Sequence, residues 1–247
     1  MRLLTVDIET FPHEGYFWGM FDQNISLDML KKAGTIACWA AKWHGDKSVH
    51  FASVHEGTER AMLRKAHDLL DEADAVISWN GTPFDVKWLQ GQILKHRLPP
   101  PRPFKQIDLL RTWRQQFRTA SNKLDYAAGF LGIGQKVKTG GFGLWRDCMA
   151  GDDKAWDRMR RYNIGDVRLT EAVYDVIRPW IKNHPNAGVF AGRHCCPKCE
   201  SAHVQARGYY VTRDRRYPQF QCRTCFTWLY KISGALQEGV QKMRATP

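Results

Sequence analysis

Four acidic residues and one tyrosine, spread over three short motifs, are the side chains of this sequence best suited to chemistry. Asp7 and Glu9 stand in Asp-Ile-Glu-Thr near the start, Asp85 follows a phenylalanine in the middle, and Tyr162 and Asp166 lie in Tyr-Asn-Ile-Gly-Asp. Divalent ions such as Mg²⁺ prefer oxygen ligands, and a pair of ions about 4 Å apart can activate water beside a phosphodiester. The set therefore predicts a site for two divalent cations that hydrolyses phosphodiester bonds.

Each motif taken alone has an ordinary structural interpretation. Asp-x-Glu is common on a solvated strand edge, Asn-x₃-Phe-Asp is typical of a turn before a capped helix, and Tyr-x₃-Asp suits a packed tyrosine followed by a surface acid. Their occurrence together, in this order and on suitable elements, favours the metal site.

The first acidic pair is positioned by a predicted strand. Residues 2–8 alternate, with Leu4, Val6 and Ile8 on one face, as in a half-buried strand. Asp7 and the acid two residues later then project from the opposite face.

The remaining elements predict an α/β fold. We expect further strands at 15–20, 35–43, about 49–54, 75–79 and ending at 107–110, helices over 58–72 and 84–95, and mostly helix from there to about 182. Strands in a meander, followed by strands that alternate with helices, indicate a mixed sheet flanked by helices. Asp85 would follow a buried strand, and Asp166 would lie on a late helix.

The three motifs resemble those of the DEDD superfamily of 3′→5′ exonucleases, the proofreading-type family with a ribonuclease H-like fold. The resemblance covers about residues 1–182. The spacing of Tyr162 and Asp166 matches the tyrosine subclass, since the histidine subclass would need His where this chain has Arg161. The segments that begin at Tyr162 and at Lys123 (Lys-Leu-Asp-Tyr) are most similar to stand-alone phage or bacterial exonucleases related to the exonuclease domain of B-family polymerases.

The resemblance implies a two-metal enzyme that uses Mg²⁺ or Mn²⁺. Asp7 would bridge both ions, Glu9 and Asp166 would complete the site of the water-activating ion, and Asp85 would act on the second ion, partly through water. Tyr162 would position the attacking water, because a tyrosine with a pKa near 10 is a poor base at neutral pH.

The resemblance also implies a substrate and its contacts. Thr10 and Phe11 would lie beside the terminal nucleotide and Asn80 near the 3′ end, although Asn80 could equally cap the helix that follows. The expected reaction releases nucleoside monophosphates from single-stranded 3′ ends, with DNA favoured over RNA. An exoribonuclease, a structure-selective endonuclease and a non-enzymatic binding module are the alternatives, and the last is disfavoured because clustered acids facing a polyanion need metals.

Cysteines near the C-terminus have the spacing of a zinc site. Two Cys-x₂-Cys pairs predict a tetrahedral zinc ribbon, with the ligands Cys196, Cys199, Cys222 and Cys225. Cys195 or His194 could replace Cys196, although the Cys-Pro-x-Cys pattern favours Cys196. Arg213, Arg215 and Arg216 are interleaved with tyrosines nearby, which favours nucleic-acid binding over protein docking or a purely structural role.

A turn-rich break at 184–188 divides the sequence. We expect an exonuclease domain over 1–185, and a zinc ribbon with a tail over 186–247 that includes a helix at 235–244. A glycine-rich stretch after Lys136 and Lys138 predicts either a mobile loop beside the substrate channel or an ordinary surface loop.

Composition supports a polyanionic partner. The 247 residues include 37 Lys+Arg and 25 Asp+Glu, a formal net charge of +12, which favours nucleic acid. We expect no membrane association, because no apolar run approaches the length of a membrane helix, and no signal peptide. The expected location is the cytoplasm, that of the host if the protein is phage-encoded. Proofreading would need a polymerase or another replication or repair protein in trans.

Overall fold

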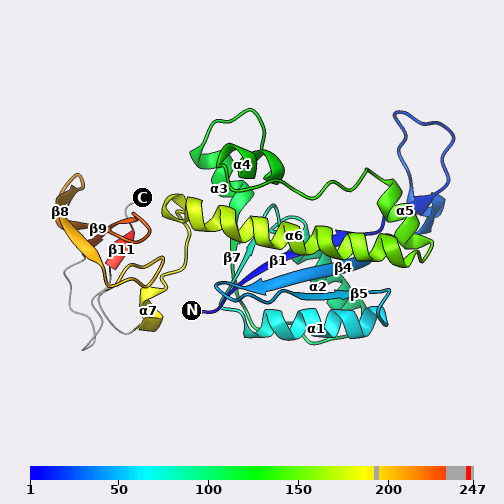
Figure 1. Cartoon of the computed structure of the whole chain (residues 1–247), viewed down its shortest axis with the longest axis horizontal. Coiled ribbons are helices and arrows are strands. Elements are labelled where there is room, and N and C mark those ends of the chain that lie inside the picture. Colours follow the sequence, from blue (N-terminus) through cyan, green and yellow to red (C-terminus); the bar gives the residue numbers. More distant parts are fainter. Residues whose placement is uncertain (192–194, 232–242, 246–247) are drawn as a thin grey trace.

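A five-stranded mixed sheet forms the centre of the molecule (Figure 1). The computed structural model of the chain describes residues 1–191, 195–231 and 243–245. The strand order is β5-β4-β1-β6-β7, with β1 antiparallel to β4 and parallel to β6. The strands are β1 (Leu3–Thr10), β4 (Ile36–Trp43), β5 (His50–Ser53), β6 (Ala75–Ser78) and β7 (Lys105–Asp108).

Helices cover both faces of this sheet. Leu4, Val6 and Ile8 of β1 pack with the core of α1 (Glu59–Glu72) and α2 (Asp85–Lys95). The other face packs against α3 (Leu109–Gln116), α4 (Leu124–Phe130), α5 (Gly143–Met149) and the long α6 (Asp153–Ile177). Because side chains alternate along β1, Asp7 and Glu9 share the face that α6 covers.

A second, smaller sheet lies beyond the C-terminal end of α6 (Figure 1). It has the order β11-β10-β9-β8 and is antiparallel throughout. The chain reaches it through the short helices η2 (Arg178–Trp180) and α7 (Gly188–Ala191). Its strands are β8 (Val204–Val211), β9 (Arg216–Cys222), β10 (Trp228–Lys231) and β11 (Met243–Ala245).

The structure confirms the mixed sheet flanked by helices and most of the predicted elements. The strand predicted at 15–20 is wrong: only β2 (Glu14–Gly15) pairs, with β3 (Leu30–Lys32) after η1 (Leu27–Met29). Its aromatic residues imitate a strand, but the segment leaves the sheet, and Trp18 is 97% exposed. The strand expected to end at 107–110 stops at Asp108, because this side chain accepts a hydrogen bond from the Arg111 N–H and caps α3.

The C-terminal helix predicted over 235–244 is wrong for residues 243 and 244, the part of it that the structure describes. Residues 243–245 form β11, whereas 235–242 lie outside the described residues, as does His194. Within the part of the chain that the structure describes, no helix has the length and apolar character needed to cross a membrane.

Candidate active site and cysteine cluster

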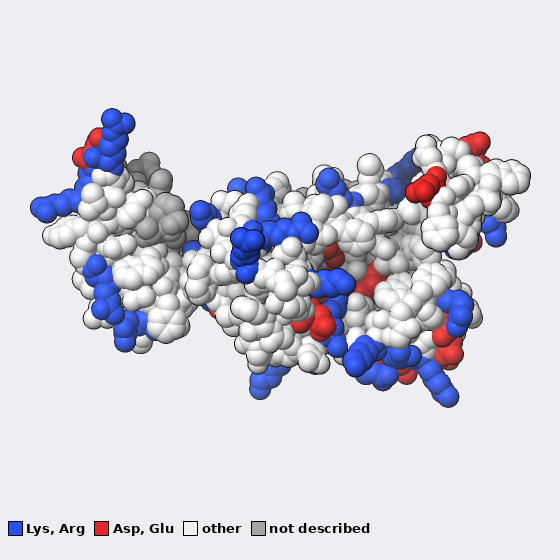
Figure 2. All heavy atoms as spheres, turned by 90° about the horizontal axis from the view of Figure 1, so that it is seen from above, with Lys and Arg blue, Asp and Glu red and all other residues white. Residues whose placement is uncertain are grey.

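Three carboxylates from β1 and α6 converge on one point. Asp7, Glu9 and Asp166 each offer an oxygen, and these oxygens all lie within 4.8 Å of one another. The central strand supplies two of them, and the helix packed across it supplies the third. Figure 2 shows acidic atoms in a hollow near the middle of the molecule, bordered by Lys and Arg.

Asp85 lies next to this group but outside the tightest cluster. It is the first residue of α2 and is 5% exposed, and its Oδ1 accepts a hydrogen bond of 3.0 Å from the backbone N–H of Ile8. The position of Asp85 close to β6 depends on Gly81, since a Cβ there would lie 2.2 Å from Ser78 Oγ and 3.3 Å from Asp85 Oδ2. Only glycine leaves this space open.

Asn163 orients the central carboxylate. Its Nδ2 donates to Asp7 Oδ2 at 2.6 Å and to the Asp7 carbonyl at 3.3 Å, and the residue is fully buried. Sequence reasoning did not assign it a role, although its place directly after Tyr162 in the third motif is a usable signal.

Lys136 supplies the cation that faces the acids. Its Nζ lies 2.6 Å from Asp166 Oδ2 and 5.0 Å from the ring centre of Tyr162. The sequence predicts this lysine only in a loop, beside the channel or on the surface, whereas the structure puts it against the acids. Burial lowers the pKa of Lys136, but the charge of Asp166 together with hydrogen bonds to Asp166 and Tyr162 outweighs burial and raises that pKa above its ordinary value.

The carboxylates hold their protons unusually strongly. Burial, then repulsion from Asp85 and Glu9, raises the pKa of Asp7 well above its ordinary value. Burial and the charge of Asp166 raise the pKa of Glu9 to about 8, and burial raises that of Asp85 to about 7. Such shifts indicate more negative charge than nearby protein cations balance.

The donor set fits a divalent cation. Asp166 Oδ1 is buried and has no hydrogen-bond partner within the described part of the chain, while its other oxygen meets Lys136. A cation with oxygen ligands would use this oxygen and balance the charge of the cluster. The acidic triad is therefore a possible metal site.

Tyr162 stands one helical turn before Asp166, which brings both side chains to the same side of α6. Burial and the charge of Asp166 raise the pKa of its phenol. The phenol therefore keeps its proton at neutral pH and can act as a hydrogen-bond donor. Trp145 packs edge-on against its ring, 6.2 Å away between centres.

Three residues predicted to contact the terminal nucleotide lie at the end of β1 and after β6. Thr10 ends β1 after a shift in register, and Phe11 packs edge-on against Trp156 with ring centres 6.0 Å apart. Asn80 is exposed with φ of 69°, and its N–H donates to Asp108 Oδ1 at 3.1 Å. The alternative that Asn80 caps α2 is wrong, because the residue at that position is Phe84.

Four cysteines form a second cluster between the start of the small sheet and its β9–β10 turn. Their sulfurs all lie within 4.8 Å of one another, with Cys196–Cys225 and Cys199–Cys222 each 3.5 Å apart. This is a possible metal site, compatible with a zinc ribbon. Cys195 is buried outside this group, with its sulfur 4.0 Å from the Gly188 carbonyl.

The predicted arginine contacts lie at the far end of the small sheet. Arg213 and Arg215 are exposed in the turn between β8 and β9. Arg216 begins β9, and its guanidinium lies 4.9 Å from the ring centre of Tyr209. Cation and aromatic face are thus paired on the surface of the small sheet.

Comparison with protein families places this fold. Residues 27–178 match the RNase_H_2 family model, described as RNase_H superfamily, and this is more than half of the chain. The chain belongs to the RNase H superfamily. The matched range contains Asp85, Tyr162 and Asp166, while Asp7 and Glu9 precede it. Among curated proteins, none matches the sequence.

Comparison with solved structures finds similar chains at low sequence identity. The structure of the family B DNA polymerase from the hyperthermophilic archaeon Pyrobaculum calidifontis is 17% identical, with a TM-score of 0.54, over 72% of this chain and 24% of the polymerase. Trypanosoma brucei RNase D is 18% identical, with a TM-score of 0.45, over 70% of this chain and 56% of RNase D. The chain thus spans about a quarter of the length of the polymerase and just over half that of RNase D.

Proposed function

We propose that this chain is a metal-dependent 3′→5′ exonuclease of the tyrosine subclass, which removes nucleoside monophosphates from single-stranded 3′ ends. The observation that carries the proposal is the convergence of ligand oxygens of Asp7, Glu9 and Asp166 within 4.8 Å. Asp85, at the start of α2, is held beside them by its hydrogen bond from Ile8 of β1. Membership of the RNase H superfamily supports a nuclease.

The acids would divide between two cation positions. Asp7, Glu9 and Asp166 would hold one Mg²⁺ or Mn²⁺, and Asp7 with Asp85 a second. The bound pair would supply activation of water and stabilisation of the leaving oxygen. Asn163 fixes the Asp7 carboxylate by its hydrogen bond, so the carboxylate that would serve both cations is oriented before substrate arrives.

Tyr162 orients the water that attacks the phosphorus. Because its pKa is raised, the phenol acts as a donor and not as a base. Lys136 pairs with Asp166 and would turn toward the phosphate once cations occupy the acids. Thr10, Phe11 and Asn80 would contact the terminal nucleotide.

DNA is the favoured polymer, and the likeness to a family B DNA polymerase supports it. A 3′→5′ exoribonuclease is the alternative on the same fold, since only contacts to the sugar separate the two. We place the exonuclease in residues 1–185, as in stand-alone phage or bacterial enzymes. It would act in the cytoplasm, and proofreading would need a polymerase or a repair protein in trans.

Residues 186–247 form the proposed zinc ribbon. One structural Zn²⁺ would be held by Cys196, Cys199, Cys222 and Cys225. Such a small unit has little core of its own and takes folding free energy from the metal. Arg213, Arg215 and Arg216 would contact nucleic acid through its phosphates.

The test uses 5′-labelled single-stranded DNA and RNA, with Mg²⁺ or Mn²⁺, and strands blocked at the 3′ end. We expect a metal-dependent ladder that shortens from the 3′ end, faster on DNA, and lost in Asp7→Asn. Internal cleavage of blocked strands would instead identify an endonuclease. No cleavage of any strand would reject the proposal.

A further inference from the structure

A cavity of about 640 Å³ separates the end of α6 from the small sheet. On the exonuclease side its wall is formed by the segment after α6, including Trp180 and Lys182, and by Gln116 at the end of α3. On the ribbon side it is formed by β9, by β10 and by the turn between them. The cavity is thus built by both parts of the chain.

Aromatic rings stand on both walls of the cavity. Trp180 is 49% exposed, Phe226 61% and Trp228 42%. Trp180 is held edge-on by Phe117, with ring centres 5.7 Å apart, so that it presents a fixed face. Large exposed rings on both walls of one hollow favour a planar ligand that can stack.

The polar groups in the cavity suit a nucleotide. The cationic side chains of the cavity are Lys182 and Lys198. Among the described residues that line the cavity there is no Asp or Glu. Lys198 Nζ donates to the Pro179 carbonyl at 2.7 Å and so joins the two walls. Side chains of Gln219 and Gln221 can donate to and accept from the edges of an unpaired base.

The ribbon wall continues as a row of tyrosines. Gln221 pairs with Trp228 and Gln219 with Tyr230 across the sheet, which places these four side chains on one face. Tyr230 stacks on Tyr210 with ring centres 4.8 Å apart. The face toward the cavity therefore offers further rings to neighbouring bases.

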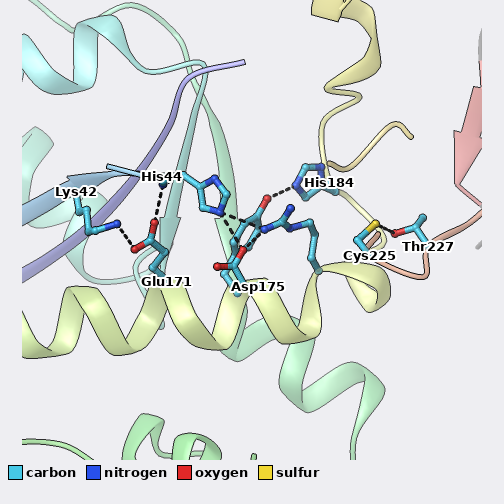
Figure 3. A network of polar contacts seen from close by, with 10 residues as sticks. Lys42, His44, Glu171, Asp175, His184, Cys225 and Thr227 are labelled. Carbon is cyan, nitrogen blue, oxygen red and sulfur yellow. Dashed lines mark hydrogen bonds and ion pairs between the residues drawn. The ribbon is translucent and has the colours of Figure 1, made fainter. Parts of the chain in front are cut away.

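The exonuclease wall is fixed to the central sheet by the polar network in Figure 3. His44 on the loop after β4 contacts Asp175 of α6 at 2.9 Å, and Asp175 is paired with Arg178. His184 lies 2.7 Å from the Tyr174 hydroxyl. The segment that carries Trp180 is anchored on both sides, so the wall is formed before a ligand binds.

A basic surface joins the cavity to the acids. In Figure 2, Lys and Arg gather between the ribbon and the acidic hollow. Exposed basic side chains of α3 and the segment after it are Arg111, Arg114, Arg118 and Lys123. At 1.5 Å per residue in α6 and 2.0 Å per residue in the 3₁₀ helix η2, Asp166 and Trp180 are about 20 Å apart along the helix axis. At 3.4 Å per stacked nucleotide, this span holds about six nucleotides.

We propose that this cavity binds an unpaired base of the substrate strand, about six nucleotides from the 3′ end, stacked between Trp180 and the ribbon. The inference rests on the proposed function for the position of the 3′ end. It makes the ribbon and the exonuclease a joint site for single-stranded nucleic acid, in which the strand runs over the basic surface to the acids.

The test compares a strand of about twelve nucleotides, which reaches the cavity at 3.4 Å per nucleotide, with one of about three, which does not. Trp180→Leu and Phe226→Leu remove a ring but keep an apolar side chain. We expect each to raise KM for the long strand about tenfold, with kcat unchanged and the short strand cut as by the native protein. Trp180→Phe should restore KM. Leu94→Ala, at a 77% exposed position on α2, is the control and should change nothing.

Equal KM for the long strand in native and variant proteins would overturn the inference and leave the cavity to a protein ligand. Equal losses on both lengths would also overturn it, since they would indicate damage to the acidic site. Cleavage of neither strand by the native protein would reject the proposed function alone. In that case, fluorescence anisotropy of the labelled long strand still tests the cavity, and Trp180→Leu and Phe226→Leu should weaken its binding about tenfold.

Discussion

Replacing Glu9 with glutamine should stabilise the magnesium-free protein at neutral and higher pH. The pKa of Glu9 rises from 4.5 to about 8, first through burial and then through the charge of Asp166. Because this pKa is raised, the contribution of Glu9 to the free energy of unfolding is fully present below pH 4.5 and is lost as the pH rises through about 8. A glutamine side chain does not ionise in the folded or the unfolded state, so this loss disappears in Glu9→Gln.

The size of this loss of stability follows from the difference between the pH of the experiment and the ordinary pKa of Glu9, 4.5. At pH 7 the folded carboxyl still holds a proton that the unfolded chain releases, and at 1.36 kcal/mol per pH unit this lowers the free energy of unfolding by about 3 kcal/mol. For a chain of this size, 1 kcal/mol moves Tm by about 2–4 °C. Glu9→Gln should therefore melt roughly 10 °C above the native protein at pH 7, and close to it at pH 4.

The assay is thermal unfolding from pH 4 to pH 8 in magnesium-free buffer without a chelator, so that the proposed zinc is not removed from the four-cysteine site. Saturating Mg²⁺ should raise Tm of the native protein and reduce its difference from Glu9→Gln, because the cation restores the stability that the ionised acids lose. Glu56→Gln, at an exposed position, is the control and should show neither effect. A Glu9→Gln variant that is no more stable at pH 8 than the native protein would refute the reasoning.

Three further substitutions test the supports of the two sites. Gly81→Ala should destabilise the protein in urea unfolding, because its Cβ would lie 2.2 Å from Ser78 Oγ, and adding Ser78→Gly should recover most of the loss; no recovery would place the strain elsewhere. Asn163→Ala should lower the free energy of unfolding by about 1–3 kcal/mol and reduce metal-dependent cleavage, since it removes the hydrogen bond to Asp7; unchanged cleavage would count against its positioning role. Cys222→Ser should reduce bound zinc, measured by a chelating dye, while far-UV circular dichroism retains the signal of the helices; full zinc content would remove this cysteine from the ligand set.

Short, ordered motifs in the sequence predicted that the acidic side chains would cluster, as Asp7, Glu9 and Asp166 do. Alternation along the first strand places Asp7 and Glu9 on one face, and α6 covers that face in the structure. The same patterns could not predict Lys136 against Asp166, because a lysine in a glycine-rich loop has no periodicity to fix its direction. Tertiary packing alone brings it to the acids.

The exposed hairpin after the first strand shows where composition misleads. Residues 15–20 have the aromatic content of a strand, yet they have no sheet partner beyond β2, and Trp18 remains exposed. Likewise, the cavity beside Trp180 could not be predicted, because its two walls are about 40 residues apart in sequence. Both features depend on how elements meet and not on local propensity.

The most direct test of the central claim is the first product released from a single strand labelled at its 3′-terminal nucleotide. With Mg²⁺, the proposed arrangement of Asp7, Glu9, Asp85 and Asp166 predicts a labelled mononucleotide from the first turnover, and none from Asp7→Asn. A labelled oligonucleotide as the first product, or equal release by Asp7→Asn, would contradict it.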